Sequence, residues 1–466
     1  MFVRDIKRLL FLTVPIIILL YTIITFYTRS KGTEWIPPII DKFNAGHGEG
    51  NADLNHEQEA QAPIGHGKSE SFEAPAANAP PSHLPLSNSS ALPNIQVTHQ
   101  EIFSISTMDK KYFAIDFGEG HKGMNPNIIP HPTLADTWIV VAQLARGADE
   151  QSVYFTELVC HATFQFGVLR CLEPPTALPV QPTEGGICEG KLDYFSANVG
   201  PHDARVVYGP ESPYIVYGSN SQFTCFGQFI QDFRELVDWT GQWGGSKAFL
   251  RGTELQRPLP WNAVEKNWFP FWDTAGQMYI HHDVAPKRVF SRVLPDGSAS
   301  VNLALLTEEE DNKCLEKYLP KTISENESVH QASNSLKVTM CKRTDAICIA
   351  DKSNTFIFTI WQHKSFYNWH AVYEPYVMLF QEQAPFAIHA MSKRPIWIHG
   401  RQQYPDRLTS EMIYVTSIAW KSPLLTYHGY LDDELFIGFG IEDKASGGID
   451  VTAEELLAGL GLCTEA

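Results

Sequence analysis

The sequence is poor in basic residues and lacks the short motifs of several common enzyme classes. It has 36 Lys and Arg against 53 Asp and Glu, a formal net charge of −17. Because nucleic-acid phosphates are bound through clusters of Lys and Arg, this balance argues against a nucleic-acid-binding protein. No G-x-S-x-G elbow, H-E-x-x-H helix, P-loop or D-x-D motif occurs. A serine hydrolase, a zinc peptidase, a P-loop NTPase and a metal-dependent nucleotide-sugar transferase are therefore disfavoured.

No cysteine precedes Cys160, and no two cysteines have the C-x-x-C spacing. Their number, eight, is even, which is consistent with disulfides formed in an oxidising compartment. The lack of a C-x-x-C pair leaves little case for structural zinc or for thioredoxin-like chemistry. Cys341 and Cys348 bracket the segment KRTDAI and form a plausible hairpin staple.

Charge is also missing from residues 9–28, LLFLTVPIIILLYTIITFYT. At about 1.5 Å rise per residue, a helix of this length spans the roughly 30 Å hydrocarbon core of a bilayer. No A-x-A cleavage pattern follows, so a retained signal anchor is predicted. Arg4, Lys7 and Arg8 slightly favour a cytosolic N-terminus. We expect a single-pass type II membrane protein of the Golgi or another secretory membrane, with a cytosolic tail at 1–8 and a lumenal globular part.

Residues 29–95 contain few large apolar side chains and many Gly, Pro, Ala, Ser and acidic residues. Such a segment buries too little surface to offset its chain entropy, so a disordered stem is predicted. Asn88 and Asn326 lie in N-glycosylation sequons, which fits lumenal exposure. Tail, anchor, stem and large domain form the layout of many Golgi glycosylation enzymes, and anchored receptors share it.

The apolar residues of segment 96–466 come in short runs rather than at helical spacing, for example TWIVVAQ, YIVYGS, TFIFTIW and EMIYVTSIAW. These runs are rich in Val, Ile, Thr and aromatic residues and end at Pro, Gly, Asp or Asn, which is typical of strands. Two β-sandwiches or a propeller could hold so many strands. Five four-stranded blades fit the length, and radial repetition removes exposed sheet edges, so an all-β, five-bladed β-propeller is predicted.

Two further expectations concern local structure in this domain. A helix is expected near the C-terminus, where Thr452 and Glu455 have the spacing of a capping box. The acidic run Glu308–Asp311 is expected in a loop.

Four clusters of polar residues beside apolar runs are candidate sites. The inner strands of a propeller bring carboxylates from different blades into one funnel, where they can act on a glycosidic bond. In GPHDAR (200–205) the acidic residue Asp203 and the basic residue Arg205 are two residues apart, so an extended backbone places them on one face. The other clusters are VEKNWFPF (264–271), YIHHDVAP (279–286) and FGIED (439–443). The adjacent His281 and His282 would point to opposite faces of a strand, and no metal or cofactor is predicted.

At these clusters the sequence resembles the five-bladed propellers of the mannoside phosphorylase and β-mannosyltransferase group. The similar segments are GPHDAR for that group's G-x-E-D-P-R, EKNWFPF (265–271) and YIHHDVAP for its E-K-N-[WF]-x-P-F blade, FGIED for its closing Y-G-x-x-D, and NPNIIPHP (125–132) for the start of its first blade. His202 and Ala204 replace the Glu and Pro of G-x-E-D-P-R, and ESVHQASNSL (327–336) stands where the group has R-G-G-T-P. The likeness is strongest to anchored fungal-type members of unassigned activity.

The resemblance implies a role for each matching residue. Asp203 would be the catalytic acid or base, and Arg205 and Lys266 would hold a donor phosphate. The other predicted substrate-binding residues are His202, Asn267 and His330, together with Glu265, Asp283 and Asp443, which would bind sugar hydroxyls.

The favoured function is a lumenal, membrane-anchored glycosyltransferase that moves a mannose-type sugar from a sugar-nucleotide or sugar-phosphate donor to a glycan acceptor. Two alternatives stay open. One is a membrane-anchored glycoside hydrolase or phosphorylase that uses Asp203, and the other is a non-catalytic propeller that binds glycan. The anchor and stem favour transfer over hydrolysis, whereas the changes at His202 and Ala204 weigh against phosphorolysis and towards a binding module.

Overall fold

The computed structural model describes residues 94–145, 153–185, 187–239, 247–322, 327–367 and 370–465. All of them lie in one compact unit, Asn78–Ala466. The predicted tail, anchor and sequons fall outside the described residues, as does the predicted stem apart from its last two residues. Within the described ranges, no helix has the length and apolar character needed to cross a bilayer.

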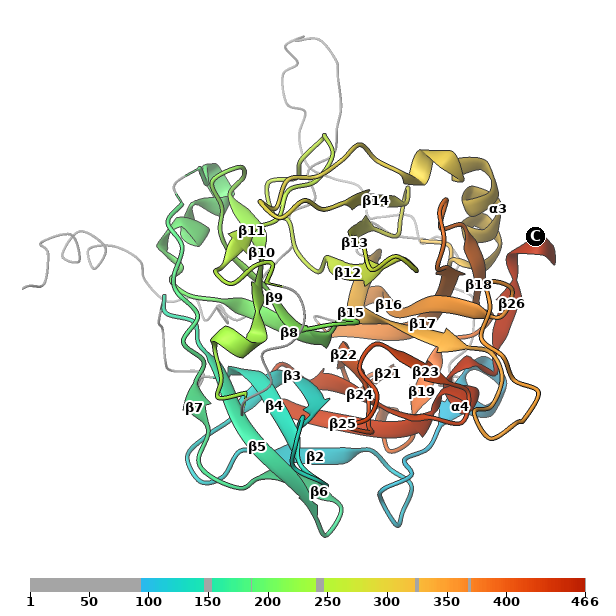
Figure 1. Ribbon diagram of the computed structural model, residues 1–466. Helices are drawn as coiled ribbons and strands as arrows, with labels where there is room; N and C mark the ends of the chain where they lie inside the picture. The colour runs from blue at the N-terminus through green and yellow to red at the C-terminus, as the bar shows by residue number, and fades with distance from the viewer. Residues whose placement is uncertain are drawn as a thin grey trace, which may run out of the picture. The chain divides into compact units, whose positions relative to one another are not determined.

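The described residues form an all-β protein with few helices, as predicted (Figure 1). Most strands belong to antiparallel groups that follow one another along the chain. The groups consist of β3 (Gly123–Pro130), β4 (Trp138–Leu144), β5 (Glu157–Gln165) and β6 (Val168–Cys171); β8 (His202–Tyr208), β9 (Pro213–Asn220), β10 (Phe226–Asp232) and β11 (Thr253–Glu254); β12 (Phe269–Trp272), β13 (Met278–Asp283) and β14 (Val289–Arg292); β15 (Ser328–Thr339), β16 (Thr355–Tyr367), β17 (His370–Gln381) and β18 (Ile388–Ser392); and β22 (Ile413–Trp420), β24 (Glu434–Ile441) and β25 (Ala445–Thr452).

Shorter strands pair at the margins of these groups. They are β1 (Gln100–Ile102) with β19 (Ile396–Ile398), β7 (Thr176–Ala177) with β5, β20 (Gln403–Tyr404) with β21 (Thr409–Ser410), β23 (His428–Tyr430) with β15, and β26 (Leu460–Leu462) with β18. In the same part of the chain the helices are α2 (Ile95–Thr98), α3 (Glu308–Tyr318) and α4 (Ala453–Leu457), with 3-10 turns at Gly190–Ala197, Phe233–Glu235, Ala304–Leu306 and Cys463–Glu465.

The first strands of the groups, β3, β8, β12, β15 and β22, lie toward the middle of the domain, with the later strands outside them (Figure 1). Polar side chains join neighbouring first strands by bonding to the backbone of the next one. These links run from Asn127 to Ala204 and Val206, from Asn334 to Ile418, from Ser335 to Pro270, and from Thr416 and Ser417 to Pro126. Buried backbone groups that lie outside a ladder need such partners, so the side chains fix the first strands relative to one another.

Four of these first strands are irregular. The pairing register shifts between Met124 and Asn127 in β3 and between His202 and Arg205 in β8. Similar shifts occur in β15 and β22. Because a bulge bends a strand and re-aims its side chains, these positions are where residues can turn out of a sheet.

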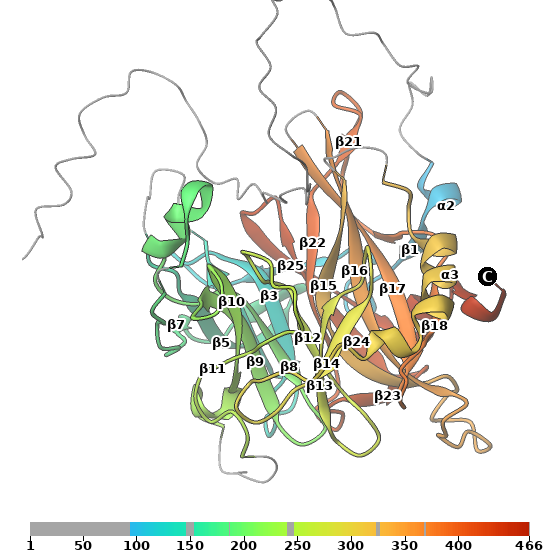
Figure 2. The ribbon, with the colours of Figure 1, turned by 90° about the horizontal axis from the view of Figure 1, so that it is seen from above.

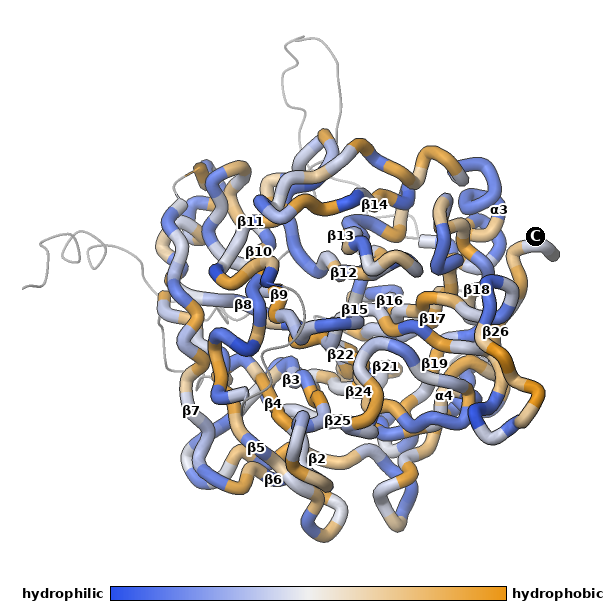
Figure 3. Tube along the Cα trace, viewed as in Figure 1, coloured by the Kyte–Doolittle hydropathy of each residue, from blue (hydrophilic) through white to orange (hydrophobic). Residues whose placement is uncertain are grey.

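The core lies between the sheets and is built from aliphatic and aromatic side chains. Its largest cluster includes Trp268, the residue before β12, with Phe358 of β16 and Trp420 of β22, and all three are at most 2% exposed. Helix α3, in contrast, is drawn largely in hydrophilic colours (Figure 3).

Strand β2 (Phe113–Asp116) closes the sheet between the first and the last group. It pairs antiparallel with β25, where Phe113 faces Gly448, and parallel with β6, where Ile115 faces Leu169. The segment before β2 is held by the buried carboxylate of Asp450, which accepts hydrogen bonds from the Ser104 hydroxyl (2.6 Å), the Ser106 hydroxyl (2.6 Å) and the Lys421 ammonium (2.7 Å).

Replacing Asp450 with Ala is expected to lower the free energy of unfolding by about 3 kcal/mol, because it removes a buried ionic acceptor that serves several donors. Urea unfolding of the full chain, read by tryptophan fluorescence, would measure the loss. Asp109, whose side chain is 62% exposed, supplies the control variant Asp109→Ala. A loss below about 1 kcal/mol would mean that water replaces the Asp450 contacts.

The prediction for Glu308–Asp311 was wrong, because these residues begin helix α3 rather than a loop (Figure 2). Asp311 is buried, accepts the Thr307 hydroxyl (2.8 Å) and pairs with Arg288 (3.0 Å), so tertiary contacts stabilise an acidic helix start. The terminal helix is confirmed: α4 begins after Thr452, whose hydroxyl accepts the Glu455 N–H (3.2 Å).

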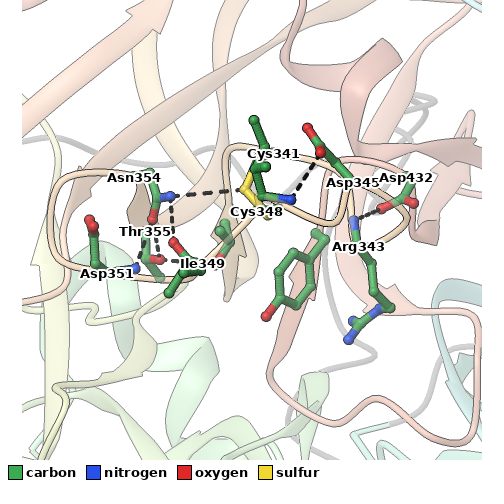
Figure 4. The surroundings of a disulfide bond; sticks show 12 residues. Cys341, Arg343, Asp345, Cys348, Ile349, Asp351, Asn354, Thr355 and Asp432 are labelled. Atoms are coloured by element: carbon green, nitrogen blue, oxygen red, sulfur yellow. Dashed lines mark hydrogen bonds between the residues drawn. A yellow bond between two sulfur atoms is a disulfide. The ribbon is translucent and has the colours of Figure 1, made fainter.

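All eight cysteines form disulfides, and the predicted staple between Cys341 and Cys348 is confirmed (Figure 4). The loop that it closes is tied to the turn before β24, because the backbone N–H of Arg343 donates to Asp432 (2.6 Å). Cys314 of α3 bonds to Cys463, which anchors the C-terminus beside that helix.

Candidate active site

The start of β8 is shaped by a close approach of two backbones. Gly200 has φ 103°, and a Cβ there would overlap the carbonyl oxygen of Phe155. The His202 ring packs at a tilt of 34° against the Phe155 ring, with centroids 3.6 Å apart, and meets the Phe226 ring edge-on at 5.2 Å. His202 is 4% exposed. The residue predicted to bind substrate therefore packs between two aromatic rings.

Asp203 sits at the bulge and adopts φ 48°, in the left-handed region that non-glycine residues seldom occupy. Its side chain is partly exposed and accepts a hydrogen bond from the Asn125 amide (2.8 Å). Asn125 reaches Asp203 across Gly440 of β24, where any Cβ would collide with the Asn125 side-chain oxygen. The site is thus assembled from the first strands of two groups and from one glycine of a third.

Positive charge surrounds the Asp203 carboxylate. Burial raises the pKa of this group, but Arg205, Lys266 and the Asn125 hydrogen bond lower it by more, so the pKa lies below the ordinary value of 3.8. Asp203 is therefore ionised at neutral pH.

Arg205 is buried and already engaged. Its guanidinium donates to the backbone oxygen of Asp203 (2.6 Å) and to the side-chain oxygen of Asn267 (3.2 Å). Simple alternation along β8 predicts Asp203 and Arg205 on one face, but the bulge between His202 and Arg205 breaks that alternation. Arg205 thus links β8 to the segment before β12, and Lys266, next to Asn267, is the partly exposed cation of the site.

Glu265 and Asp283 form a separate cluster around Arg257. The Arg257 guanidinium donates to both carboxylate oxygens of Glu265 (3.2 and 3.0 Å) and also to Asp283. Glu265 is 2% exposed, and its other donors include the Asn262 N–H (2.6 Å). Glu265 therefore serves the structure of the loop that carries Lys266, whereas Asp283 keeps part of its surface exposed.

The two remaining predicted binding residues lie on other elements. His330 of β15 is 8% exposed, bonds to the Ser328 hydroxyl (2.8 Å) and meets the Tyr373 ring edge-on. Asp443 is exposed in the turn between β24 and β25, at φ 49°. The structure brings Asp203, Arg205, Lys266 and Asn267 together.

Three residues of the site were missed from the sequence: Asn125, Gln143 and Glu157. Gln143 accepts the Asp203 N–H (2.9 Å), and Glu157 accepts the Ala204 N–H (3.2 Å). One signal was available, since Gln143 and Glu157 are polar positions in the otherwise apolar runs TWIVVAQ and ELV. In the described part of the chain, no group of His, Cys, Asp and Glu side chains is arranged to hold a metal.

The sequence matches no protein-family model and no curated protein. Among solved structures, β-1,2-mannobiose phosphorylase from Listeria innocua aligns over 77% of this chain and 96% of its own, with 10% identity and a TM-score of 0.41. A mannose phosphorylase from Leishmania mexicana aligns over 75% and 90%, with 10% identity and a TM-score of 0.41. A GDP-Man-dependent mannosyltransferase from the same organism aligns over 73% and 88%, with 10% identity and a TM-score of 0.38.

Proposed function

We propose that the chain is a carbohydrate-active enzyme whose reacting centre is Asp203. The observation that carries this proposal is the environment of its carboxylate, which is partly exposed, held at a left-handed backbone position and surrounded by Arg205 and Lys266. Perturbed carboxyl groups on strained backbone occur preferentially at active sites.

We infer that the domain is a five-bladed propeller. Support comes from the consecutive antiparallel groups, from the polar links between first strands, and from β2, which pairs with both the first and the last group. In this arrangement the bulged ends of the first strands surround one funnel, and a sugar ring would bind beside Asp203.

Transfer is the reaction that an ionised Asp203 suits best. An ionised carboxylate can take the proton of an acceptor hydroxyl but cannot protonate a glycosidic oxygen, so the charge of Asp203 favours its role as the base in transfer over a role as the acid in hydrolysis or phosphorolysis. In the proposed step the acceptor hydroxyl gives its proton to Asp203 while its oxygen bonds to the anomeric carbon. The bond from that carbon to the donor phosphate breaks, and its electron pair leaves with the phosphate oxygen.

Lys266 is proposed to meet the departing phosphate, since its ammonium is close enough to Asp203 to lower that group's pKa and its side chain is partly exposed. Arg205 adds to the positive charge of the site, and its hydrogen bonds hold the Asp203 backbone and the Asn267 side chain in place. A mannose-type donor, a glycan acceptor and a lumenal domain anchored by residues 9–28 are proposed from the sequence resemblance and the apolar run.

The reaction is tested by incubating the purified full chain in detergent with mannose-containing acceptors and, separately, GDP-mannose or mannose 1-phosphate. A new glycosidic product that requires one of these donors is expected. Release of free sugar without a donor would support a hydrolase instead, and phosphate-dependent release of mannose 1-phosphate would support a phosphorylase. Saturable glycan binding with no product would support the non-catalytic alternative.

A further inference from the structure

Two side chains from the first group hold the backbone on either side of the Asp203 Cα. The Asp203 N–H donates to the Gln143 side-chain oxygen (2.9 Å), and the Ala204 N–H donates to a Glu157 carboxyl oxygen (3.2 Å). Gln143 of β4 and Glu157 of β5 are a directly opposed cross-strand pair. They therefore act as one acceptor platform beneath the bulge of β8.

This platform is what the bulge requires. The register of β8 with β9 breaks between His202 and Arg205, so the N–H groups of Asp203 and Ala204 have no regular ladder partners. Backbone held at φ 48° persists only where the surroundings over-determine it. If the two acceptors are lost, Asp203 is free to return to an extended conformation and its carboxylate moves away from Asn125.

Glu157 is an unusual acceptor for this position. It is 0% exposed, and its second carboxyl oxygen has no hydrogen-bond partner among the described residues. The charged groups that face the Glu157 carboxyl are Asp203 and Arg205, both on β8. The neighbouring strands β4 and β7 contribute only side chains that do not titrate here, namely Gln143 and the residues Thr176–Ala177. A buried anion with one hydrogen bond, beside a second carboxylate, is strongly disfavoured.

We propose that Glu157 is a positioning residue that works as a neutral carboxylic acid, holding Asp203 in its reactive conformation while leaving it the negative charge of the site. The proposal rests on the proposed function of Asp203. Glu157 itself is too deeply buried to touch a substrate, so it acts through the Ala204 peptide.

The electrostatics agree with this geometry. Burial raises the pKa of Glu157 from 4.5 to about 8; the Ala204 N–H lowers it in part, the Asp203 charge raises it, and Arg205 lowers it. Glu157 therefore keeps its proton at neutral pH and loses it in mildly alkaline solution. The new anion then repels both Asp203 and a phosphate-bearing donor.

The test compares the full chain with Glu157→Gln, which keeps an acceptor oxygen and cannot ionise. In the wild type, kcat/KM is expected to fall roughly tenfold per pH unit above about pH 8. In Glu157→Gln turnover persists and this alkaline fall is absent. Glu157→Leu removes the acceptor, and kcat is expected to fall by at least about tenfold at every pH. Glu254→Gln, at a carboxyl on β11 whose pKa burial also raises, is the matched control and should keep the wild-type profile.

A second measurement separates this inference from the proposed function. The folded-state pKa of Glu157 is raised, so its stabilising contribution is full below about pH 4.5 and is lost as the pH rises to about 8. The urea midpoint of the wild type should therefore drop over this range relative to that of Glu157→Gln, whether or not a sugar substrate is found. Equal pH dependence of the two midpoints, or an unchanged alkaline fall of kcat/KM in Glu157→Gln, would overturn the role of Glu157.

Discussion

Replacing Asp203 with Asn is expected to lower kcat by about a thousandfold while the protein stays folded. General-base catalysis contributes typically about 10²–10⁴ in rate, and an amide cannot accept the proton of the acceptor hydroxyl. The side-chain oxygen of Asn can still accept the Asn125 hydrogen bond (2.8 Å in the wild type), so the local structure is retained. The rate of glycosidic product formation, measured at saturating donor and acceptor, gives the effect.

Asp406→Asn is the matched control, because that side chain is 76% exposed and lies outside the site. Its rate should equal that of the wild type, and the urea midpoint of Asp203→Asn should stay close to the wild-type value. A wild-type rate in Asp203→Asn would remove Asp203 from the mechanism.

The second large effect is expected at Arg257, where replacement with Ala should lower the free energy of unfolding by about 3–5 kcal/mol. Arg257 neutralises the Glu265 carboxylate, which is 2% exposed, and also pairs with Asp283. Removing the cation leaves a buried carboxylate without its ionic partner, which is the costly way to break a buried pair. Urea unfolding with linear extrapolation would measure the loss.

A double-mutant cycle gives this prediction its sharpest form. Glu265→Gln removes the charge that Arg257 serves, so the loss in the double variant should be smaller than the sum of the single losses. Arg407→Ala, at a side chain that is 67% exposed, should change stability by no more than about 0.5 kcal/mol. Additive losses would show that Arg257 and Glu265 do not depend on each other.

The same variants decide what Glu265 does. As a structural partner of Arg257 it should affect stability first, and activity only through Lys266, the next residue. As a ligand of a sugar hydroxyl, which the sequence predicts, it should raise KM in Glu265→Gln without loss of stability. The burial of Glu265 and its bonds to Arg257 and Asn262 favour the first outcome.

Much of the fold follows from local pattern. Short runs rich in β-branched and aromatic residues, such as TWIVVAQ and TFIFTIW, become strands β4 and β16, and the Thr452 capping box begins α4. Helix α3 could not be predicted in this way, because its acidic first turn reads as solvated loop. What makes it a helix is distant in sequence: Arg288 pairs with Asp311, and Cys463 bonds to Cys314.

The candidate site, like the fold, could be predicted from the sequence only in part. The sequence pointed to Asp203, Arg205, Lys266 and Asn267, which the structure brings together. Gln143 and Glu157, in contrast, act on β8 from strands 60 and 47 residues earlier in the chain. The sequence around a polar residue in an apolar strand does not show which backbone group that residue will bond to. Only the packing of β4 and β5 against β8 therefore shows that Gln143 and Glu157 belong to the site.

The double pairing of β2 also sets the order of events during biosynthesis. Phe113 and its partner Gly448 are 335 residues apart in the chain, whereas Ile115 and its partner Leu169 are only 54 apart. Domains otherwise tend to fold as units while the chain lengthens, N-terminal part first. Here β2 can pair with β6 early, but its other edge stays unpaired until β25 has been synthesised. Because contacts of such long sequence separation form slowly, the pairing of β2 with β25 is expected to be a late step of folding.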